Sequence, residues 1–303
     1  MKSWYKYFVY ISLVFLAVAL YNANFLKVPK IFSISSLIAS FIFLFAGFVI
    51  NAITWQKVLS ESNYSVDLSS CIAGVGLSIF GKYIPGKIWM VMGRAAYITE
   101  KFHHSLGTLS AVSLNAQFIA IWFGLVFGVI GLFLLGGLHL WGWLILFLWV
   151  GLAVVIFSEL AHDHAERAIR SLLRKYITLP RFTIKSTISV MPWFVAYWVF
   201  WSFGFYLLVT SLIRMDVPWS VGFGFPLAST LGIMTLISPG GLGTREAVLV
   251  GYLTLAGIPV VDATTIAVAS RLWFLGGEIF IFVLGLISHK RLPDVIQKKV
   301  VRS

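Results

Sequence analysis

The chain has 303 residues, of which 59% are hydrophobic and 11% are charged. A soluble domain of this size cannot bury so much apolar surface, and the long apolar runs exclude an outer-membrane barrel of short alternating strands. The composition therefore predicts an all-α polytopic membrane protein. The net charge of +12 then indicates basic loops beside anionic lipid, and we expect no nucleic-acid partner.

The N-terminus resembles a signal peptide. Lys2 and Lys6 precede an apolar run over 7–20, and Ala17-Val18-Ala19 resembles a cleavage site. Residues 21–28 stay semi-apolar and lack the usual polar region before such a site. We therefore favour an uncleaved first helix over a cleaved signal peptide.

Six apolar runs have the length of about 20 residues that a membrane span needs. They lie near 7–26, 33–57, 105–135, 141–160, 188–212 and 264–288. Two further regions, 68–99 and 221–257, are long but interrupted, so each of their arms is short for a full crossing. We expect each interrupted region to be a re-entrant helical hairpin.

The interruptions are Pro-Gly turns with basic residues beside them. The first reads Gly81-Lys82-Tyr83-Ile84-Pro85-Gly86-Lys87, and the second runs from Ser238 to Glu246. A helix broken in lipid leaves N–H and C=O groups that find no water, so such breaks are tolerated only inside protein or beside a cavity. Two breaks in corresponding halves of a chain point to a transport site.

The positive charges predict the orientation. With a cytoplasmic N-terminus, the basic loop 161–187 and the basic C-terminal tail both face the cytoplasm, whereas loop 136–141, which lacks Lys and Arg, faces outside. Lys27 and Lys30 are the exceptions. The first hairpin then enters from the cytoplasm and the second from outside, so units 33–135 and 188–288 form an inverted repeat. We expect a single multi-pass domain over 1–303 in the cell (inner) membrane, with both termini cytoplasmic.

Periodicity predicts an amphipathic helix within 161–187. Apolar residues share one face and Arg167, Arg170 and Arg174 share the opposite one. Such a helix lies on the cytoplasmic leaflet.

A phosphate site is the functional prediction for the two breaks. Thr244 is the expected N-cap of the half-helix after the second break, with Arg245 and Glu246 in its first turn. Helix N-termini together with Lys82, Lys87 and Arg245 suit an anion, above all a phosphate, and Arg94 is placed to face the same cavity. The alternative is that these are tight turns with packing glycines and with lysines that reach the surface.

Two ionisable residues lie inside the last span. Arg271 and Glu278 are seven residues apart, so they share a helix face but are too far apart to touch. Glu246 and Arg245 are the expected partners across the half-repeat. The ion pairs are either structural or gates that open as pairs exchange.

Other chemistry-bearing residues have simpler interpretations. The amides of Asn51, Asn115 and Gln117 are expected to make interhelical hydrogen bonds, and Cys71 is expected to be a small core residue. Tryptophans such as Trp198 and Trp201 are expected at the membrane interface or facing lipid. The cluster at 162–166 lacks a second group of ligands, so no metal, cofactor or catalytic residue is assigned.

The two break motifs resemble the signatures of the lysylphosphatidylglycerol synthase transmembrane family, a flippase-like family of integral membrane domains. The resemblance rests on residues 81–89 with Gly93-Arg94 and on residues 238–246. It implies movement of lipids between leaflets; the best-known members flip aminoacylated phosphatidylglycerol, and other relatives are linked to polyprenyl-phosphate sugars or hopanoids. By the resemblance, the lipid-headgroup cavity is lined by Lys82, Pro85, Gly86, Lys87, Arg94, Pro239, Gly240, Gly241, Gly243, Thr244, Arg245 and Glu246.

One departure limits what the resemblance implies. Those best-known members add a soluble aminoacyltransferase domain, for which this sequence has no counterpart, so we expect no synthase activity. The leading hypothesis is a non-enzymatic flippase for an anionic or phosphate-bearing lipid. The alternatives are an intramembrane enzyme that uses Glu246 or Glu278 as acid/base, and an accessory subunit of a lipid or glycan synthase. Whether the chain forms a homo-oligomer or binds a synthase stays open.

Overall fold

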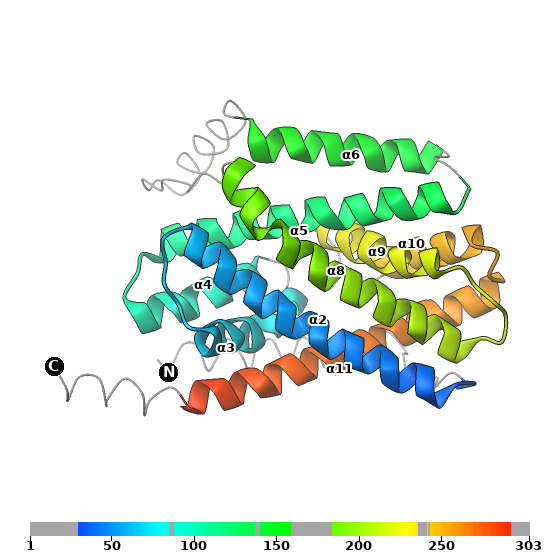
Figure 1. Ribbon diagram of the computed structural model, residues 1–303, viewed down its shortest axis with the longest axis horizontal. Helices are drawn as coiled ribbons and strands as arrows, with labels where there is room; N and C mark the ends of the chain where they lie inside the picture. Colours follow the sequence, from blue (N-terminus) through cyan, green and yellow to red (C-terminus); the bar gives the residue numbers. More distant parts are fainter. Residues whose placement is uncertain are drawn as a thin grey trace.

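The computed structural model describes residues 30–84, 88–136, 140–158, 184–235, 241 and 243–291 (Figure 1). Over these ranges the chain forms nine α-helices and two short 3-10 helices, with no strand. The all-α class predicted from composition is confirmed. The predicted first span 7–26 and nearly all of the predicted linker 161–187 lie outside the described residues.

Four long helices form the frame. They are α2 (Ile34–Glu61), α5 (Leu106–Leu134), α8 (Ile184–Leu212) and α11 (Val260–Arg291), and each is long and apolar enough to cross a membrane. They coincide with four of the predicted spans, although α8 begins within the last residues assigned to the linker. A fifth predicted span, 141–160, corresponds to α6 (Leu140–Phe157), whose 18 residues extend about 27 Å.

The helices α2 and α8 run antiparallel along their lengths (Figure 1). At one end the hydroxyl of Ser189 donates to Oε1 of Glu61 at 2.6 Å. At the other end the backbone N–H of Phe32 donates to the carbonyl of Ser211 at 2.8 Å. These contacts fix the two ends of the bundle, and the Glu61 end also carries the start of α5 and the end of α11.

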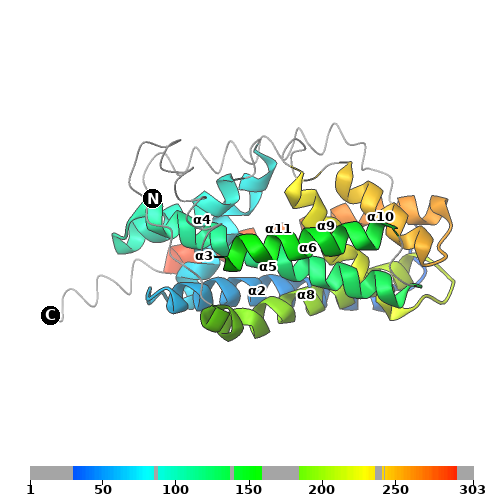
Figure 2. The same ribbon diagram turned by 90° about the horizontal axis from the view of Figure 1, so that it is seen from above.

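The short helices form two hairpins. The first hairpin (68–102) consists of α3 (Leu68–Ser78), the 3-10 helix η1 (Ile79–Tyr83) and α4 (Trp89–Phe102). The second hairpin (219–255) consists of η2 (Trp219–Phe223), α9 (Gly224–Met234) and α10 (Thr244–Leu255). Figures 1 and 2 both show α3 and α4 gathered at the Glu61 end and α9 and α10 at the opposite end. The 14 residues of α4 extend only about 21 Å, which is short of the ~30 Å hydrocarbon layer.

Polar contacts join the open ends of the first hairpin. Asp67 is the N-cap of α3 and accepts from the backbone N–H of Ser70 at 2.8 Å. Lys101, in the last turn of α4, donates to the Ser70 hydroxyl at 2.5 Å and lies 3.7 Å from Oδ1 of Asp67. Burial acts to raise the pKa of Asp67, but the Ser70 hydrogen bonds and the charge of Lys101 outweigh it and hold the pKa below its usual value. The contacts hold the start of α3 beside the end of α4.

Glycines let α3 lie directly against α11. A Cβ atom at Gly76 would lie 2.3 Å from the carbonyl oxygen of Ile281 and 3.0 Å from Cα of Gly285. Small residues at such crossings allow close backbone approach, which is the main source of helix association in membranes. The first hairpin is therefore held on α11 by backbone contact as well as by side chains, and Cys71 on α3 is fully buried as predicted.

Replacing Gly76 with alanine is expected to lower the stability of the protein by about 1–3 kcal/mol, because α3 must move away from α11. The change is checked by thermal unfolding of purified protein in detergent. Gly251→Ala is the matched control, since a Cβ atom there meets nothing within 4 Å. Equal melting temperatures for the two variants would contradict the close approach of α3 and α11.

Candidate functional site

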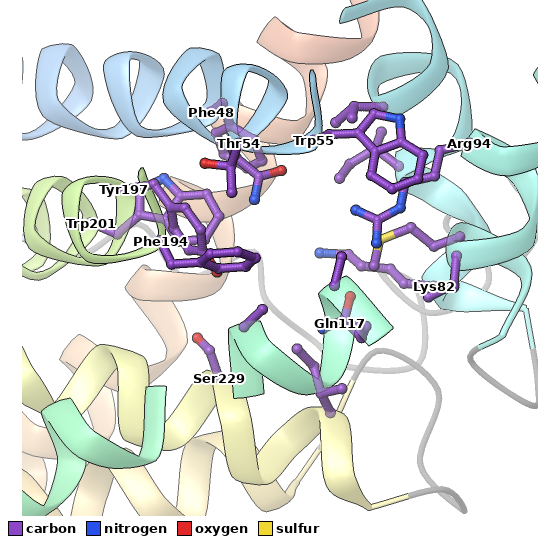
Figure 3. A pocket seen from close by; sticks show the side chains of 18 of the residues that line it. Phe48, Thr54, Trp55, Lys82, Arg94, Gln117, Phe194, Tyr197, Trp201 and Ser229 are labelled. Atoms are coloured by element: carbon purple, nitrogen blue, oxygen red, sulfur yellow. The ribbon is translucent and has the colours of Figure 1, made fainter. Parts of the chain in front are cut away.

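A cavity of ≈ 170 Å³ lies between the two hairpins and the long helices (Figure 3). Residues of both hairpins and of α2, α5, α8 and α11 line it. One water molecule needs about 10–15 Å³ of such space, so the cavity has room for several waters or for a compact polar group.

Three cations lie in the cavity wall. Lys82 comes from η1, Arg94 from α4 and Arg245 from α10, so both hairpins contribute. No Asp or Glu is among the described residues that line the cavity. The wall is therefore positively charged, which suits an anionic ligand.

Arg245 is placed by the start of α10. Gly243, with φ +82°, is the N-cap of this helix and Thr244 is its first residue, so the prediction of Thr244 as N-cap is wrong. Only glycine adopts this φ at little cost, which decides the position of the cap. Arg245 is therefore the second residue of α10, and its side chain lines the cavity.

The Arg245 side chain is held by aromatic rings. It is only 5% exposed, and its guanidinium carbon lies 4.8 Å from the ring centre of Phe225 and 5.1 Å from that of Phe274. Its Nε and Nη2 atoms are buried and have no hydrogen-bond partner in the described part of the chain. Two strong donors at the cavity are thus left for a ligand.

Arg94 is anchored on one side. Its Nε donates to the Ser113 hydroxyl at 2.5 Å and its Nη2 to the Ser113 carbonyl at 2.7 Å. Its guanidinium carbon lies 4.5 Å from the ring centre of Trp55. The Ser113 bonds and the Trp55 ring fix the orientation of the guanidinium in the cavity wall, and Figure 3 shows Arg94 beside Trp55.

Lys82 forms a buried ion pair with Glu278 of α11. Glu278 is 1% exposed, and its second oxygen accepts from the Tyr83 hydroxyl at 2.9 Å. The Lys82 ammonium also lies 4.8 Å from the ring centre of Phe274. Lys82 is therefore shared between the cavity and the acid behind it.

The second hairpin forms its own ion pair with α11. Arg271 Nε lies 2.5 Å from Oε1 of Glu246, and the other Glu246 oxygen accepts from the backbone N–H of Gly243 at 2.7 Å. The expected partnership of Arg271 with Glu246 is confirmed, whereas Glu278 pairs with Lys82 rather than with Arg245. The tips of both hairpins thus meet the middle of α11 on either side of Phe274.

An aromatic wall faces Lys82 and Arg94. It consists of Phe194, Tyr197, Trp198 and Trp201 of α8, all buried, and Figure 3 shows Phe194, Tyr197 and Trp201 across the cavity from Lys82 and Arg94. The prediction that Trp198 and Trp201 lie at the interface or face lipid is wrong. Their spacing of three and four residues with Phe194 and Tyr197 places them on one helix face, and this was the signal available in the sequence.

Uncharged polar side chains complete the wall. They are Asn51, Thr54, Ser78, Gln117 and Ser229. Asn51 and Gln117 were predicted to make interhelical hydrogen bonds, and the structure places them in the lining of the cavity. The Ser229 hydroxyl has no hydrogen-bond partner among the described residues.

Several predicted headgroup residues lie elsewhere. Gly241, with φ +72°, packs on Gly232 of α9. A Cβ atom at Gly241 would lie 3.0 Å from Cα of Gly232. Gly243 is exposed, and neither it nor Thr244 or Glu246 is among the lining residues. Pro85, Gly86, Lys87, Pro239 and Gly240 lie outside the described residues.

The comparisons with known proteins agree with the break motifs. Residues 4–285 match the family model described as lysylphosphatidylglycerol synthase TM region. No curated protein and no solved structure matches the chain. Because the match covers almost the entire sequence and the described helices are those of a multi-pass membrane domain, the chain belongs to the lysylphosphatidylglycerol synthase transmembrane family.

Proposed function

We propose that this protein is a lipid translocase that moves an anionic, phosphate-bearing lipid between membrane leaflets. The observation that carries the proposal is the buried Arg245, which lines the cavity and whose Nε and Nη2 have no hydrogen-bond partner in the described chain. A buried donor without a partner costs about 1–3 kcal/mol, and more when it is charged. A phosphate in the cavity removes that cost by accepting two charge-assisted hydrogen bonds.

The other cations support the same ligand. Lys82 and Arg245 both lie within about 5 Å of the Phe274 ring centre, so their charges converge on one part of the cavity although they come from different hairpins. Arg94 contributes a third charge from the wall. In a low-dielectric membrane interior such a cluster attracts an anion strongly.

The hairpins suggest how a headgroup passes. In this proposal they are re-entrant, form the inverted repeat and enter from opposite faces, so the headgroup site lies near the midplane while the acyl or prenyl chains stay in the bilayer. Movement of either hairpin tip then opens the site to one face. The ion pairs Lys82–Glu278 and Arg271–Glu246 hold these tips on α11 and are the contacts that such a movement must change.

The geometry disfavours acid/base catalysis by Glu246 and Glu278. Both oxygens of Glu278 are engaged by Lys82 and Tyr83, and both oxygens of Glu246 are engaged by Arg271 and Gly243. Neither acid is among the lining residues. A general acid or base must reach the substrate, so transport is the better supported function.

The direct test is lipid movement in reconstituted vesicles. Tail-labelled fluorescent phosphatidylglycerol is placed in vesicles with and without the purified protein, and the fraction accessible to a membrane-impermeant quencher is followed with time. We expect the protein to make the inner-leaflet lipid accessible, whereas empty vesicles keep it protected. Identical curves would count against translocation, and a modified lipid recovered from the vesicles would favour an enzyme.

Labelling of single cysteines tests the membrane orientation. In a Cys71→Ala background, His103→Cys is expected to react only from the cytoplasmic side and Asp216→Cys only from outside, since both positions are exposed and lie at opposite ends of the bundle. Each is measured in intact cells with an impermeant thiol reagent, before and after permeabilisation. Reaction of both cysteines from one side would contradict the opposed entry of the hairpins.

A further inference from the structure

The cavity wall distinguishes the two parts of a lipid headgroup. Lys82 and Arg94 lie on one side of the cavity, and Phe194, Tyr197 and Trp201 of α8 face them across it (Figure 3). A phosphate held by the cations therefore leaves the rest of the headgroup among the aromatic rings and the uncharged polar groups. The chemistry of these rings and polar side chains therefore decides which headgroup fits.

Nothing on the described wall receives an ammonium group through a carboxylate. The two acids beside the cavity, Glu246 and Glu278, already use all four of their oxygens. An ammonium in the cavity would instead lie near three cations, and at a few ångströms such like charges repel strongly in a low-dielectric site. Trp55 and Phe274 already hold the guanidinium and ammonium groups of the protein. The rings of α8 are left, but their cation–π attraction, about 0.5–2 kcal/mol, is smaller than the repulsion from three cations in a low-dielectric site.

The uncharged polar groups match hydroxyls. Asn51 and Gln117 each carry both an acceptor and donors, as a hydroxyl does. Ser229 offers a buried hydroxyl without a partner in the described chain. The wall thus supplies donors and acceptors in pairs without a negative charge.

The two tryptophans of the aromatic wall present carbon rather than polar edges. The indole N–H of Trp198 donates to the carbonyl of Ala120 at 3.0 Å, and that of Trp201 donates to the carbonyl of Leu44 at 3.3 Å. Both donors are consumed within the protein, so the rings offer apolar area to the carbon skeleton of a headgroup. A polyhydroxylated group has C–H and O–H on different faces. Its C–H face can pack on the aromatic rings while its hydroxyls bond the uncharged polar groups.

We propose that the cavity selects lipids whose phosphodiester carries an uncharged, hydroxyl-bearing group, such as glycerol, inositol or a sugar, and rejects headgroups that carry a protonated amine or a quaternary ammonium. The selectivity rests on the proposed translocation and names its substrate class. It excludes the aminoacylated phosphatidylglycerol that the best-known family members move, because that headgroup carries an amine.

Vesicles of equal lipid composition, each with one tail-labelled lipid, test the selectivity. Phosphatidylglycerol and phosphatidylinositol are expected to move at least about tenfold faster than phosphatidylethanolamine and phosphatidylcholine, a ratio that corresponds to about 1.4 kcal/mol. The faster of the first two identifies the preferred hydroxyl-bearing group. Equal rates for all four lipids, or faster movement of phosphatidylethanolamine and phosphatidylcholine, would overturn the selectivity and leave translocation intact. If none of the four lipids moves, the result counts against translocation itself.

A charge placed on the wall provides the matched variant. Gln117→Glu adds a carboxylate of nearly the same shape, so we expect the ratio of phosphatidylglycerol to phosphatidylethanolamine rates to fall at least tenfold. Asn115→Asp makes the same change two residues earlier on α5 at a position that is not among the lining residues, and its ratio is expected to stay at the wild-type value. If Gln117→Glu does not fold, Asn51→Asp makes the same test from α2. An unchanged ratio in a folded wall variant would overturn the proposal.

Discussion

Replacing Arg245 with methionine is expected to reduce lipid translocation at least tenfold while the protein stays as stable as the wild type or becomes more stable. The guanidinium is 5% exposed and two of its nitrogens have no hydrogen-bond partner in the described chain, so in the empty protein it contributes a desolvation cost without an ion pair to offset it. Apolar residues of similar volume in place of buried charges are often neutral or stabilising. The phosphate, by contrast, loses charge-assisted hydrogen bonds worth about 1.5–3 kcal/mol each.

The measurements are the rate of phosphatidylglycerol movement in vesicles and the melting temperature in detergent. Arg214→Met is the matched control, because Arg214 is exposed at the end of α8, beside Phe32 and away from the cavity. Its rate and stability are expected to equal those of the wild type. If Arg245→Met transports normally, Arg245 does not bind the headgroup; if it loses stability strongly, Arg245 has a structural role.

The length of the apolar runs was sufficient to predict the frame. Four predicted spans coincide with α2, α5, α8 and α11 within a few residues, because a helix in lipid must satisfy its own backbone groups and therefore continues as far as the apolar run does. The two interruptions were equally informative. A Pro-Gly pair disfavours a continuous helix, and on the described sides of the two interruptions η1 ends at Tyr83 and α4 begins at Trp89, whereas α9 ends at Met234 and α10 begins at Thr244.

The side-chain partners were harder to predict. Lys82 and Glu278 are separated by 196 positions, and no local pattern specifies which of several buried charges pair. Arg271 and Glu246 were expected to meet because they belong to neighbouring helices of one unit. For Glu278 the same reasoning chose Arg245, but η1 brings Lys82 and Tyr83 against α11 and both contact Glu278.

The aromatic wall shows a second limit of the sequence. Trp198 and Trp201 were assigned to the interface from residue type alone, although their spacing with Phe194 and Tyr197 marks one face of α8. In a membrane helix both faces are apolar, so hydrophobicity does not separate the lipid face from the protein face. Only the packing of α2 and α5 against α8 decides that this face lines a cavity.

The ion pair between Lys82 and Glu278 is expected to have separable roles in stability and transport. Lys82→Met leaves a carboxylate that is 1% exposed without its cation, and breaking a buried pair in this way costs about 3–5 kcal/mol. The double variant Lys82→Met with Glu278→Gln removes both charges and keeps the hydrogen bond from Tyr83, so most of the lost stability is expected to return. Thermal unfolding of both variants measures the difference.

Transport is expected to remain low in the double variant even though its fold recovers. The Lys82 ammonium is in the cavity wall, whereas Glu278 is behind it, so the double variant removes the cation and the hydrogen-bond donor that an anionic headgroup contacts directly. Lys57→Met is the control, since Lys57 is exposed beside Trp193, where it does not reach the cavity. Wild-type transport in the double variant would show that Lys82 serves only to neutralise Glu278. Wild-type stability in Lys82→Met would instead show that the buried Glu278 does not need Lys82 for the fold. The hairpin could then release Lys82 from Glu278 when the headgroup binds.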